Sequence, residues 1–187
     1  MSEKLVLNEN FGKHSGKTLK MLISEKRIKA RIKELGSQIS NNYRDVGSPL
    51  IVIGILNGSF IFMSDLVRDI NIDLEVDFMR IASYGNATSS SGTVRMIKDI
   101  NADITNRHVL VVEDIVDTGL SMNFLKNRLE QASTKSLEFA ALIMKENTKI
   151  DFDMDYVGFE IPDKYVVGYG LDLAQKLRNL KSIYYLE

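Results

Sequence analysis

The stretch Val109–Ser121, which reads VLVVEDIVDTGLS, constrains the fold of this chain more than any other. It opens with four β-favouring apolar residues, and so short an apolar run is typical of a strand buried on both faces of a parallel sheet. Three carboxylates follow: Glu113, Asp114 and Asp117. A small-residue turn, Thr118-Gly119, then precedes an amphipathic helical segment, Leu120–Leu129. This order predicts an open α/β sheet with a ligand site at the carboxyl end of its strands.

The same stretch also predicts the chemistry of the ligand. The free backbone N–H groups at the start of a helix attract a phosphate, whereas the three carboxylates repel one. A ligand with an anionic end and a hydroxylated middle, such as a ribose phosphate, satisfies both. Its phosphate would lie in the 117–121 turn, and Glu113 and Asp114 would face sugar hydroxyls or a Mg²⁺ ion, which takes oxygen ligands.

The motif resembles the phosphoribosyl-diphosphate-binding motif of the type I phosphoribosyltransferases, and the rest of the chain resembles the members of that family that act on 6-oxopurines. The resemblance implies that one continuous run binds the ribose and the 5′-phosphate: Glu113, Asp114, Ile115, Val116, Asp117, Thr118, Gly119, Leu120 and Ser121. It makes Asp117 the catalytic residue. Two alternatives remain open, an acidic rim around an ordinary turn and a receiver-like pocket with a phosphoaccepting aspartate.

Size and charge limit the other possibilities. The chain has 187 residues, of which 44% are hydrophobic, and this is enough for a single compact domain. A net charge of −1 gives no basic field for nucleic acid. The absence of cysteine suits a reducing cytoplasm, and the first ten residues lack the apolar stretch of a signal peptide. We therefore expect a cytoplasmic protein with no nucleic-acid or membrane partner.

The N-terminal third of the chain predicts an arm and a helix. Residues 1–20 are polar and rich in lysine, and we expect a loosely held arm. Ser24 is a candidate N-cap for a helix of about 18 residues with a regular apolar stripe. Basic side chains crowd between the apolar positions of residues 26–33. A solvated face explains them, and an RNA-binding face is the alternative.

A second strand and loop resemble the diphosphate site of the family. Residues 49–56 predict a central strand that ends in Asn57-Gly58-Ser59, and Ser59 is a candidate cap for a helix over 60–70, with Phe60, Met63, Val67 and Ile70 on its apolar face. The resemblance implies that the backbone of Asn57 and Gly58 binds diphosphate. It also implies a cis peptide between Leu56 and Asn57. Many relatives carry lysine at position 57, so this chain lacks that charge.

The segment 82–92 is small, polar and rich in hydroxyl groups, and it separates strands predicted over 74–81 and 93–97. A hairpin with a polar tip explains it, and a closing lid is the functional interpretation. The resemblance places Ser83 and Tyr84 in that lid.

The C-terminal third resembles the purine-binding part of the family. A strand over 136–144 ends in Lys145, which the resemblance assigns to the purine O6. The run 156–172 resembles the purine-binding hood, with further base-binding residues at Lys164, Tyr165, Val166 and Asp172. Arg178 would bind diphosphate. The metal ligands implied for Mg²⁺ are Glu113, Asp114 and Asp172.

Together these features predict an α/β fold with a doubly wound, mostly parallel sheet flanked by helices. The chain would be one domain over residues 1–187, with a core over about 24–150 and a hood built from the N-terminal arm and about 156–187. The resemblance implies a Mg²⁺-dependent purine salvage transferase that converts hypoxanthine, and guanine, with phosphoribosyl diphosphate to IMP or GMP and diphosphate. It also implies a homodimer or homotetramer. The alternatives are a regulator of the same fold that binds nucleotide and RNA, and a transferase that prefers xanthine.

Overall fold

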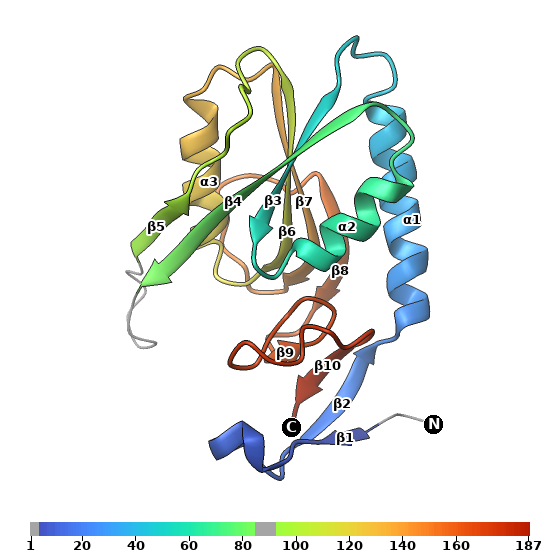
Figure 1. Ribbon diagram of the computed structural model, residues 1–187, viewed down its shortest axis with the longest axis vertical. Helices are drawn as coiled ribbons and strands as arrows, with labels where there is room; N and C mark the ends of the chain where they lie inside the picture. The colour runs from blue at the N-terminus through green and yellow to red at the C-terminus, as the bar shows by residue number, and fades with distance from the viewer. Residues whose placement is uncertain (1–3, 85–92) are drawn as a thin grey trace.

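The computed structural model describes residues 4–84 and 93–187. Figure 1 shows a large sheet with helices on both faces and a smaller sheet, formed by the two ends of the chain, below the carboxyl ends of the strands of the large one. The α/β fold with a mostly parallel sheet flanked by helices is therefore confirmed.

The main sheet has six strands in the order β5-β4-β3-β6-β7-β8. All neighbours are parallel except β4 and β5, which form an antiparallel pair. The strands are β3 (Leu50–Leu56), β4 (Leu74–Tyr84), β5 (Thr93–Lys98), β6 (His108–Val116), β7 (Ser136–Lys145) and β8 (Tyr156–Ile161). Because β3 and β6 lie at the centre, their apolar runs are buried on both faces, as the sequence predicts.

Helices cover both faces of this sheet (Figure 1). Helices α1 (Glu25–Asn42) and α2 (Phe60–Asp69) pack on one face, and α3 (Leu120–Glu130) packs on the other. The two faces alternate along each strand. Leu50 and Val52 of β3 join the core under α1 and α2, whereas Ile51 and Ile53 join the core under α3.

The smaller sheet has the order β1-β2-β10-β9 and is antiparallel. Its strands are β1 (Lys4–Val6), β2 (Thr18–Ile23), β9 (Val166–Val167) and β10 (Ile183–Leu186), and a 3-10 helix, η1 (Glu9–His14), connects β1 to β2. The prediction of a loosely held arm over residues 1–20 is wrong for residues 4–20, because β1 pairs with β2 and β2 pairs with β10, near the other end of the chain. Strand β8, over residues 156–161, pairs with β7 in the main sheet, so we define the C-terminal part of the hood as residues 162–187.

The helix caps differ from the prediction as well. Neither Ser24 nor Ser59 caps its helix with its side chain. The backbone N–H of Glu25 instead donates to the hydroxyl of Ser182, 3.0 Å away in the C-terminal segment, and Ser59 donates its own hydroxyl to the carbonyl of Ile55. A free backbone N–H at the start of α1 is thus hydrogen-bonded by the C-terminal segment, which attaches that segment to the core.

The buried face of α2 is also rotated from the predicted one. Phe62, Met63 and Leu66 are buried, whereas Phe60 is about half exposed. The sequence pattern includes both sets of apolar residues, and only the direction in which the helix crosses the sheet decides between them. Across the described parts of the chain, none of the helices is long and apolar enough to cross a membrane.

Candidate active site

The acidic pair lies inside the central strand rather than after it. Strand β6 continues to Val116, and Glu113 pairs with Ala141 of β7. Glu113 and Asp114 are both only 8% exposed. Burial first, and then the charge of Asp114, raises the pKa of Glu113 well above its usual range. Two adjacent buried carboxylates of this kind are suited to hydroxyl groups or a cation, which would stabilise their negative charge.

The turn that follows β6 has the geometry of an anion site. Gly119 lies at the start of α3 with φ +86°, and an added Cβ would clash with the carbonyl of Lys149. The turn is supported from the other side by Thr148, whose hydroxyl lies 3.0 Å and 2.9 Å from the carbonyl oxygens of Val116 and Asp117. Gly119, Ser121 and Met122, at the start of α3, line the cavity next to the turn, where the N–H groups of a helix start favour an anion.

Lys145, the last residue of β7, lies next to this turn. Its ammonium is 2.9 Å from a carboxylate oxygen of Asp117 and 2.8 Å from one of Asp163. Only 11% of the lysine side chain is exposed, against 56% for Asp117. Burial alone would lower the pKa of Lys145, but the hydrogen bonds to Asp163 and Asp117 raise it above its ordinary value. The structure thus brings together a fixed cation and an accessible carboxylate.

The hood covers this pair. Tyr165 is half exposed and lines the cavity above the pair, where an aromatic ring can stack on a flat base, and its hydroxyl donates to the carbonyl of Asp172 at 3.1 Å. Lys164 lines the same cavity, although its ammonium lies 3.9 Å from the centre of the Tyr185 ring in β10. Val166 is buried and pairs with Tyr185, so its backbone is held by the small sheet.

The loop between β3 and α2 packs directly on the acids. The predicted cis peptide between Leu56 and Asn57 is present. A Cβ added to Gly58 would clash with the carboxylate of Asp114, and a Cβ on Gly170, whose φ is +95°, would clash with the carbonyl of Gly58. Glycine at both positions therefore lets three segments meet: the loop, β6 and the hood.

Asp172 and Arg178 form an ion pair at this junction, with 2.6 Å between guanidinium nitrogen and carboxylate oxygen. The other terminal nitrogen of Arg178 donates to the carbonyl of Gly170 at 2.7 Å, and Asp172 also accepts from the backbone of Gln175 at 2.7 Å. Both charged groups are therefore held on the hood loop, where they line the cavity next to Asn57 and Gly58.

Three adjoining cavities join these features into one site. The hood cavity, of about 200 Å³, lies between Asp117, Lys145 and Tyr165. The turn cavity, of about 220 Å³, is lined by residues 115–119, Ser121 and Met122. The loop cavity, of about 240 Å³, is lined by Asn57, Gly58, the acidic pair, Asp172 and Arg178. Ile115 lines all three, so a ligand with three parts could extend from this junction into each cavity.

The predicted metal ligands do not all come together. Glu113, Asp114 and Asp172 line the loop cavity, yet across residues 4–84 and 93–187 no three Asp, Glu, His or Cys side chains are close enough to hold a metal ion. Their oxygen donors fit Mg²⁺, which often takes one or two carboxylates and completes its shell with water and substrate phosphate.

The predicted lid is only partly within the described structure. The backbones of Ser83 and Tyr84 lie at the end of β4 and pair with Val94 and Thr93. The rest of the predicted lid, residues 85–92, lies outside the described residues.

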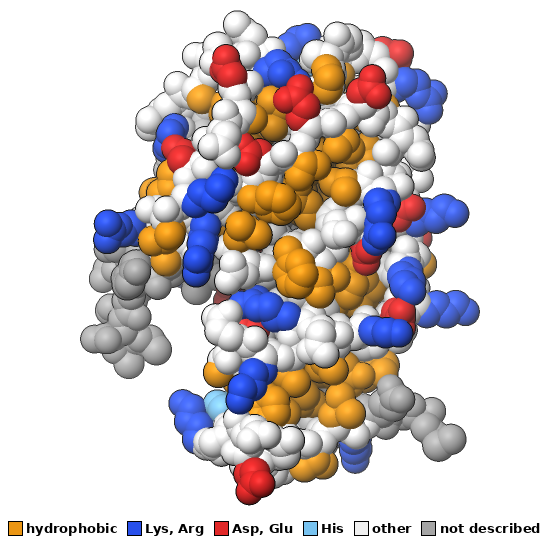
Figure 2. Space-filling view, viewed as in Figure 1, with side chains coloured by type: hydrophobic (Ala, Val, Ile, Leu, Met, Phe, Trp, Pro, Cys, Tyr) orange, Lys and Arg blue, Asp and Glu red, His pale blue; other side chains and the backbone are white. Residues whose placement is uncertain are grey.

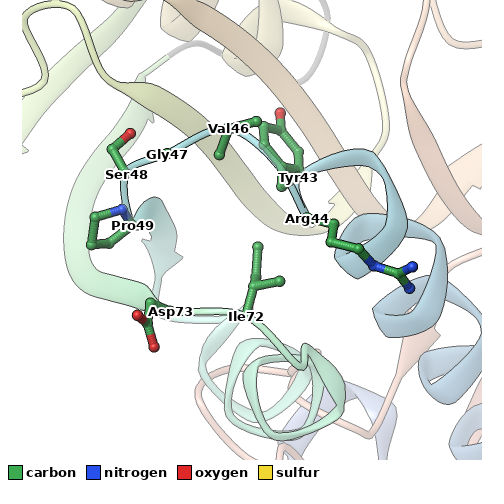
Figure 3. Close-up of a pocket in the computed structure, with 8 residues that line it drawn as sticks. All are labelled: Tyr43, Arg44, Val46, Gly47, Ser48, Pro49, Ile72 and Asp73. Atoms are coloured by element: carbon green, nitrogen blue, oxygen red, sulfur yellow. The ribbon is translucent and has the colours of Figure 1, made fainter.

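A separate cavity of about 370 Å³ lies at the opposite, amino end of the sheet (Figure 3). It is lined by Tyr43, Arg44, Val46, Gly47, Ser48, Pro49, Ile72 and Asp73. The side chain of Arg44 extends away from the others in Figure 3. None of the predicted site residues lines this cavity, so the functional groups concentrate at the carboxyl end.

Two residues of the site were missed by the sequence interpretation, Asp163 and Thr148. Asp163 directly precedes Lys164 in the run assigned to the hood. It also lies two residues after Ile161, the end of β8, and a parallel pairing of β8 with β7 brings that end to Lys145. Thr148 carries no such signal, because its contact with the turn depends on how the chain folds back after β7.

Comparison with known proteins agrees with this geometry. A family model described as the phosphoribosyl transferase domain matches residues 18–174. The hypoxanthine-guanine phosphoribosyltransferase of Aquifex aeolicus is 44% identical over 173 residues, which cover 92% of this chain and 97% of the relative. The corresponding enzyme of Bacillus subtilis is 45% identical, with coverage of 88% and 91%.

Solved structures give the same result. A hypoxanthine phosphoribosyltransferase from Staphylococcus aureus superposes with a TM-score of 0.84 at 43% identity, covering 89% of this chain and 90% of the other. The enzyme from Trypanosoma cruzi, in complex with the product IMP, gives a TM-score of 0.82 at 38% identity, with coverage of 89% and 93%.

Proposed function

This chain belongs to the phosphoribosyltransferase family, and we propose that it joins a 6-oxopurine, hypoxanthine or guanine, to phosphoribosyl diphosphate. The products are IMP or GMP and diphosphate. The base nitrogen N9 forms a bond to the anomeric carbon of the ribose while the bond from that carbon to the diphosphate oxygen breaks. The proton on N7 leaves the base in the same reaction.

The observation that carries this proposal is the pair of Lys145 and Asp117 under Tyr165. O6 and N7 are neighbours on one edge of a 6-oxopurine, and they require one hydrogen-bond donor and one acceptor side by side. The ammonium and the carboxylate stand 2.9 Å apart in the hood cavity, which meets that requirement. Lys145 donates to O6, and this disfavours adenine, whose amino group is itself a donor. Asp117 accepts the N7 proton.

The other two cavities fit the remaining parts of the substrate. The 5′-phosphate lies in the turn cavity against the N–H groups of Thr118 to Ser121, and the ribose hydroxyls face Glu113 and Asp114. The diphosphate occupies the loop cavity, where the backbone of Asn57 and Gly58 and the guanidinium of Arg178 stabilise its charge.

The carboxylates of the loop cavity would hold Mg²⁺ together with oxygens of the substrate. When bound, the ion supplies positive charge that neutralises the departing diphosphate. Asn57, an uncharged residue, leaves Arg178 as the protein cation that lines this cavity among the described residues. Closure of a lid that begins at Ser83 and Tyr84 would exclude water, which would otherwise capture the ribosyl cation.

Steady-state rates test the proposal. The purified protein is incubated with Mg²⁺, phosphoribosyl diphosphate and hypoxanthine, guanine or xanthine in turn, and the nucleotide product is measured. Turnover with hypoxanthine or guanine is expected. Turnover only with xanthine would support the xanthine-preferring alternative, and no nucleotide with any of the three bases would overturn the proposal.

The RNA-binding alternative loses much of its support in the structure. It depends on the basic residues of α1, but Arg31 donates to the carbonyls of Gly158 and Val157 at 3.1 Å and 2.8 Å, and Arg27 lies over the ring of Phe159. Figure 2 shows Lys and Arg side chains spread over this face among Asp and Glu. These arginines therefore attach α1 to β8.

We also propose that the protein works as a homodimer or homotetramer in the cytoplasm. Size-exclusion chromatography with light scattering tests the oligomeric state, and a monomer at micromolar concentration would contradict it.

A further inference from the structure

Lys145 is shared between two carboxylates on different segments. Its ammonium lies 2.9 Å from Asp117 in the β6–α3 turn and 2.8 Å from Asp163 in the hood. The lysine side chain is 11% exposed, whereas that of Asp163 is 65% exposed. A largely buried cation is thus held between two accessible anions.

The fold fixes the position of Asp163. Strand β8 pairs in parallel with β7, with Ile161 in register with Lys145, and Pro162 ends the strand. The backbone N–H of Glu146 donates to the carbonyl of Ile161 at 3.0 Å, and that of Lys164 donates to the carbonyl of Pro162 at 2.7 Å. These contacts hold the segment around Asp163 beside the end of β7, independently of the ion pair itself.

The direct pair of Lys145 and Asp117 competes with substrate. A purine that brings O6 to Lys145 and N7 to Asp117 takes up hydrogen-bonding capacity that the two groups otherwise use on each other. An ammonium has three donors, so Lys145 can keep one bond to Asp163 while another turns from Asp117 to O6. Without Asp163, the whole charge of Lys145 would be neutralised by Asp117 alone.

We propose that Asp163 is a positioning residue that anchors Lys145 at the O6 position and weakens its pairing with the general base Asp117. This inference rests on the proposed function. It concerns the binding of the base and not that of the phosphates, because Asp163 acts through Lys145, which lines the hood cavity and neither the turn cavity nor the loop cavity.

The charges around Lys145 determine how the loss of Asp163 would act. Of the two paired carboxylates, Asp117 lines the hood cavity with Lys145, and the other charged or titratable groups that line it are Asp114, Asp172, Lys164 and the phenol of Tyr165. Burial lowers the pKa of Lys145, and the two hydrogen-bonded carboxylates together raise it above its usual range. Removing one of them lowers that pKa, so the ammonium loses its proton at a lower pH.

The test compares Asp163→Asn with Glu146→Gln. Glu146 is exposed, follows Lys145 directly and forms none of the ion pairs found within residues 4–84 and 93–187. Both variants remove one negative charge near the lysine. For Asp163→Asn we expect the KM for hypoxanthine to rise by about ten-fold, as the loss of one hydrogen bond to a charged group predicts. The KM for phosphoribosyl diphosphate should stay within about two-fold.

The pH profile separates positioning from simple loosening of the fold. With Asp163→Asn, the alkaline limb of kcat/KM for hypoxanthine should move to lower pH, whereas Glu146→Gln should keep the wild-type profile. Ionisation of the base itself is common to all variants. Asp163→Glu, which restores the charge, should recover most of the loss.

The outcomes are distinct. If the wild type turns over but Asp163→Asn matches Glu146→Gln in both KM values and in pH profile, this inference is overturned and the proposed function stands. An equal rise in both KM values, or a failure of Asp163→Glu to recover activity, would overturn this inference as well. Absence of turnover in the wild type would overturn the proposed function, and this inference with it.

Discussion

At the scale of the residue, Asp117 is expected to carry the proton transfer. Its carboxylate is accessible, and Asn keeps its shape but accepts a proton poorly. We therefore expect Asp117→Asn to fold as the wild type does and to lower kcat by about 10²–10⁴. Turnover with hypoxanthine and a thermal melt followed by circular dichroism check the two halves of this prediction. A kcat near that of the wild type would contradict the assigned role.

Unlike Asp117, Glu113 is expected to lower the stability of the fold at neutral pH while supporting activity. Its pKa is raised above the usual 4.5 by burial and by the charge of Asp114. The folded protein therefore binds this proton more tightly than the unfolded chain, so the free energy of unfolding falls as pH rises from about 4.5 through the folded-state pKa. Glu113→Gln should remove that fall, making the variant more stable than the wild type at pH 8 but less active.

Denaturant unfolding at a series of pH values measures this effect in the absence of substrate and Mg²⁺. The exposed Glu160 provides the control, because Glu160→Gln removes a carboxylate without relieving a buried charge. If Glu113→Gln were no more stable than Glu160→Gln at pH 8, the buried charge of Glu113 would not destabilise the folded protein.

The sequence predicted which residues form the site, but it did not predict how they pair with one another. The resemblance identified the acids, the turn and Lys145, and the structure brings all of them to one edge of the sheet. The ion pairs within the site were not predictable, because Lys145 can face Asp163 only after β7 and β8 have paired.

At the scale of the element, the site depends on the contact between the β3–α2 loop and β6. Gly58 touches the carboxylate of Asp114, and its backbone has an ordinary negative φ, so Gly58→Ala introduces a steric clash without backbone strain. We expect it to cost about 1–3 kcal/mol of stability and to abolish most activity, because the clash moves the loop or the acid.

Gly47→Ala is the matched variant. Gly47 has φ +73° but open space around it, at the amino end of the sheet. It should lose about 1–2 kcal/mol of stability through strain and yet keep its kcat. Unfolding curves and steady-state kinetics on both proteins separate the two effects. Equal losses of activity would show that the Gly58 contact has no special role.

The elements themselves were largely predictable, but their ends were not. Period-3.6 and apolar patterns identified α1, α3 and the central strands, because their burial is regular. The extension of β6 through Glu113 and Asp114 escaped prediction, since acidic residues have a low strand propensity and only pairing with β7 keeps them in the sheet. The cap of α1 comes from Ser182, 157 residues away.

At the scale of the whole molecule, the hood joins the two ends of the chain, and this is what local patterns could not show. Residues 4–20 are polar, yet they contribute β1 and the start of β2 to a small sheet, whereas a polar composition alone predicts disorder. Strand β2 pairs with β1 on one side and with β10 on the other, so one of its two partners lies at the other end of the sequence.

The attachment of the hood to the core leads to a last prediction. Tyr169 is buried in the hood, and its hydroxyl donates to the carboxylate of Asp65 in α2. Burial, followed by this hydrogen bond and the charge of Asp65, raises the pKa of the phenol. The neighbouring Gly170 packs on Gly58, so the contact fixes the distance between the hood and the diphosphate loop.

Tyr169→Phe should therefore lower the free energy of unfolding by about 1–3 kcal/mol and raise the KM for phosphoribosyl diphosphate several-fold. Tyr156→Phe removes a similar hydroxyl, 2.8 Å from Glu138, at the far end of the main sheet. It should cost comparable stability and leave that KM unchanged. Both variants lose a phenol–carboxylate bond, and Tyr156→Phe also loses the bond that the Asn42 amide donates to the Tyr156 hydroxyl at 2.7 Å. Neither Asn42 nor Glu138 lines the loop cavity, so equal KM values would show that the hood and the diphosphate site are not coupled through Tyr169.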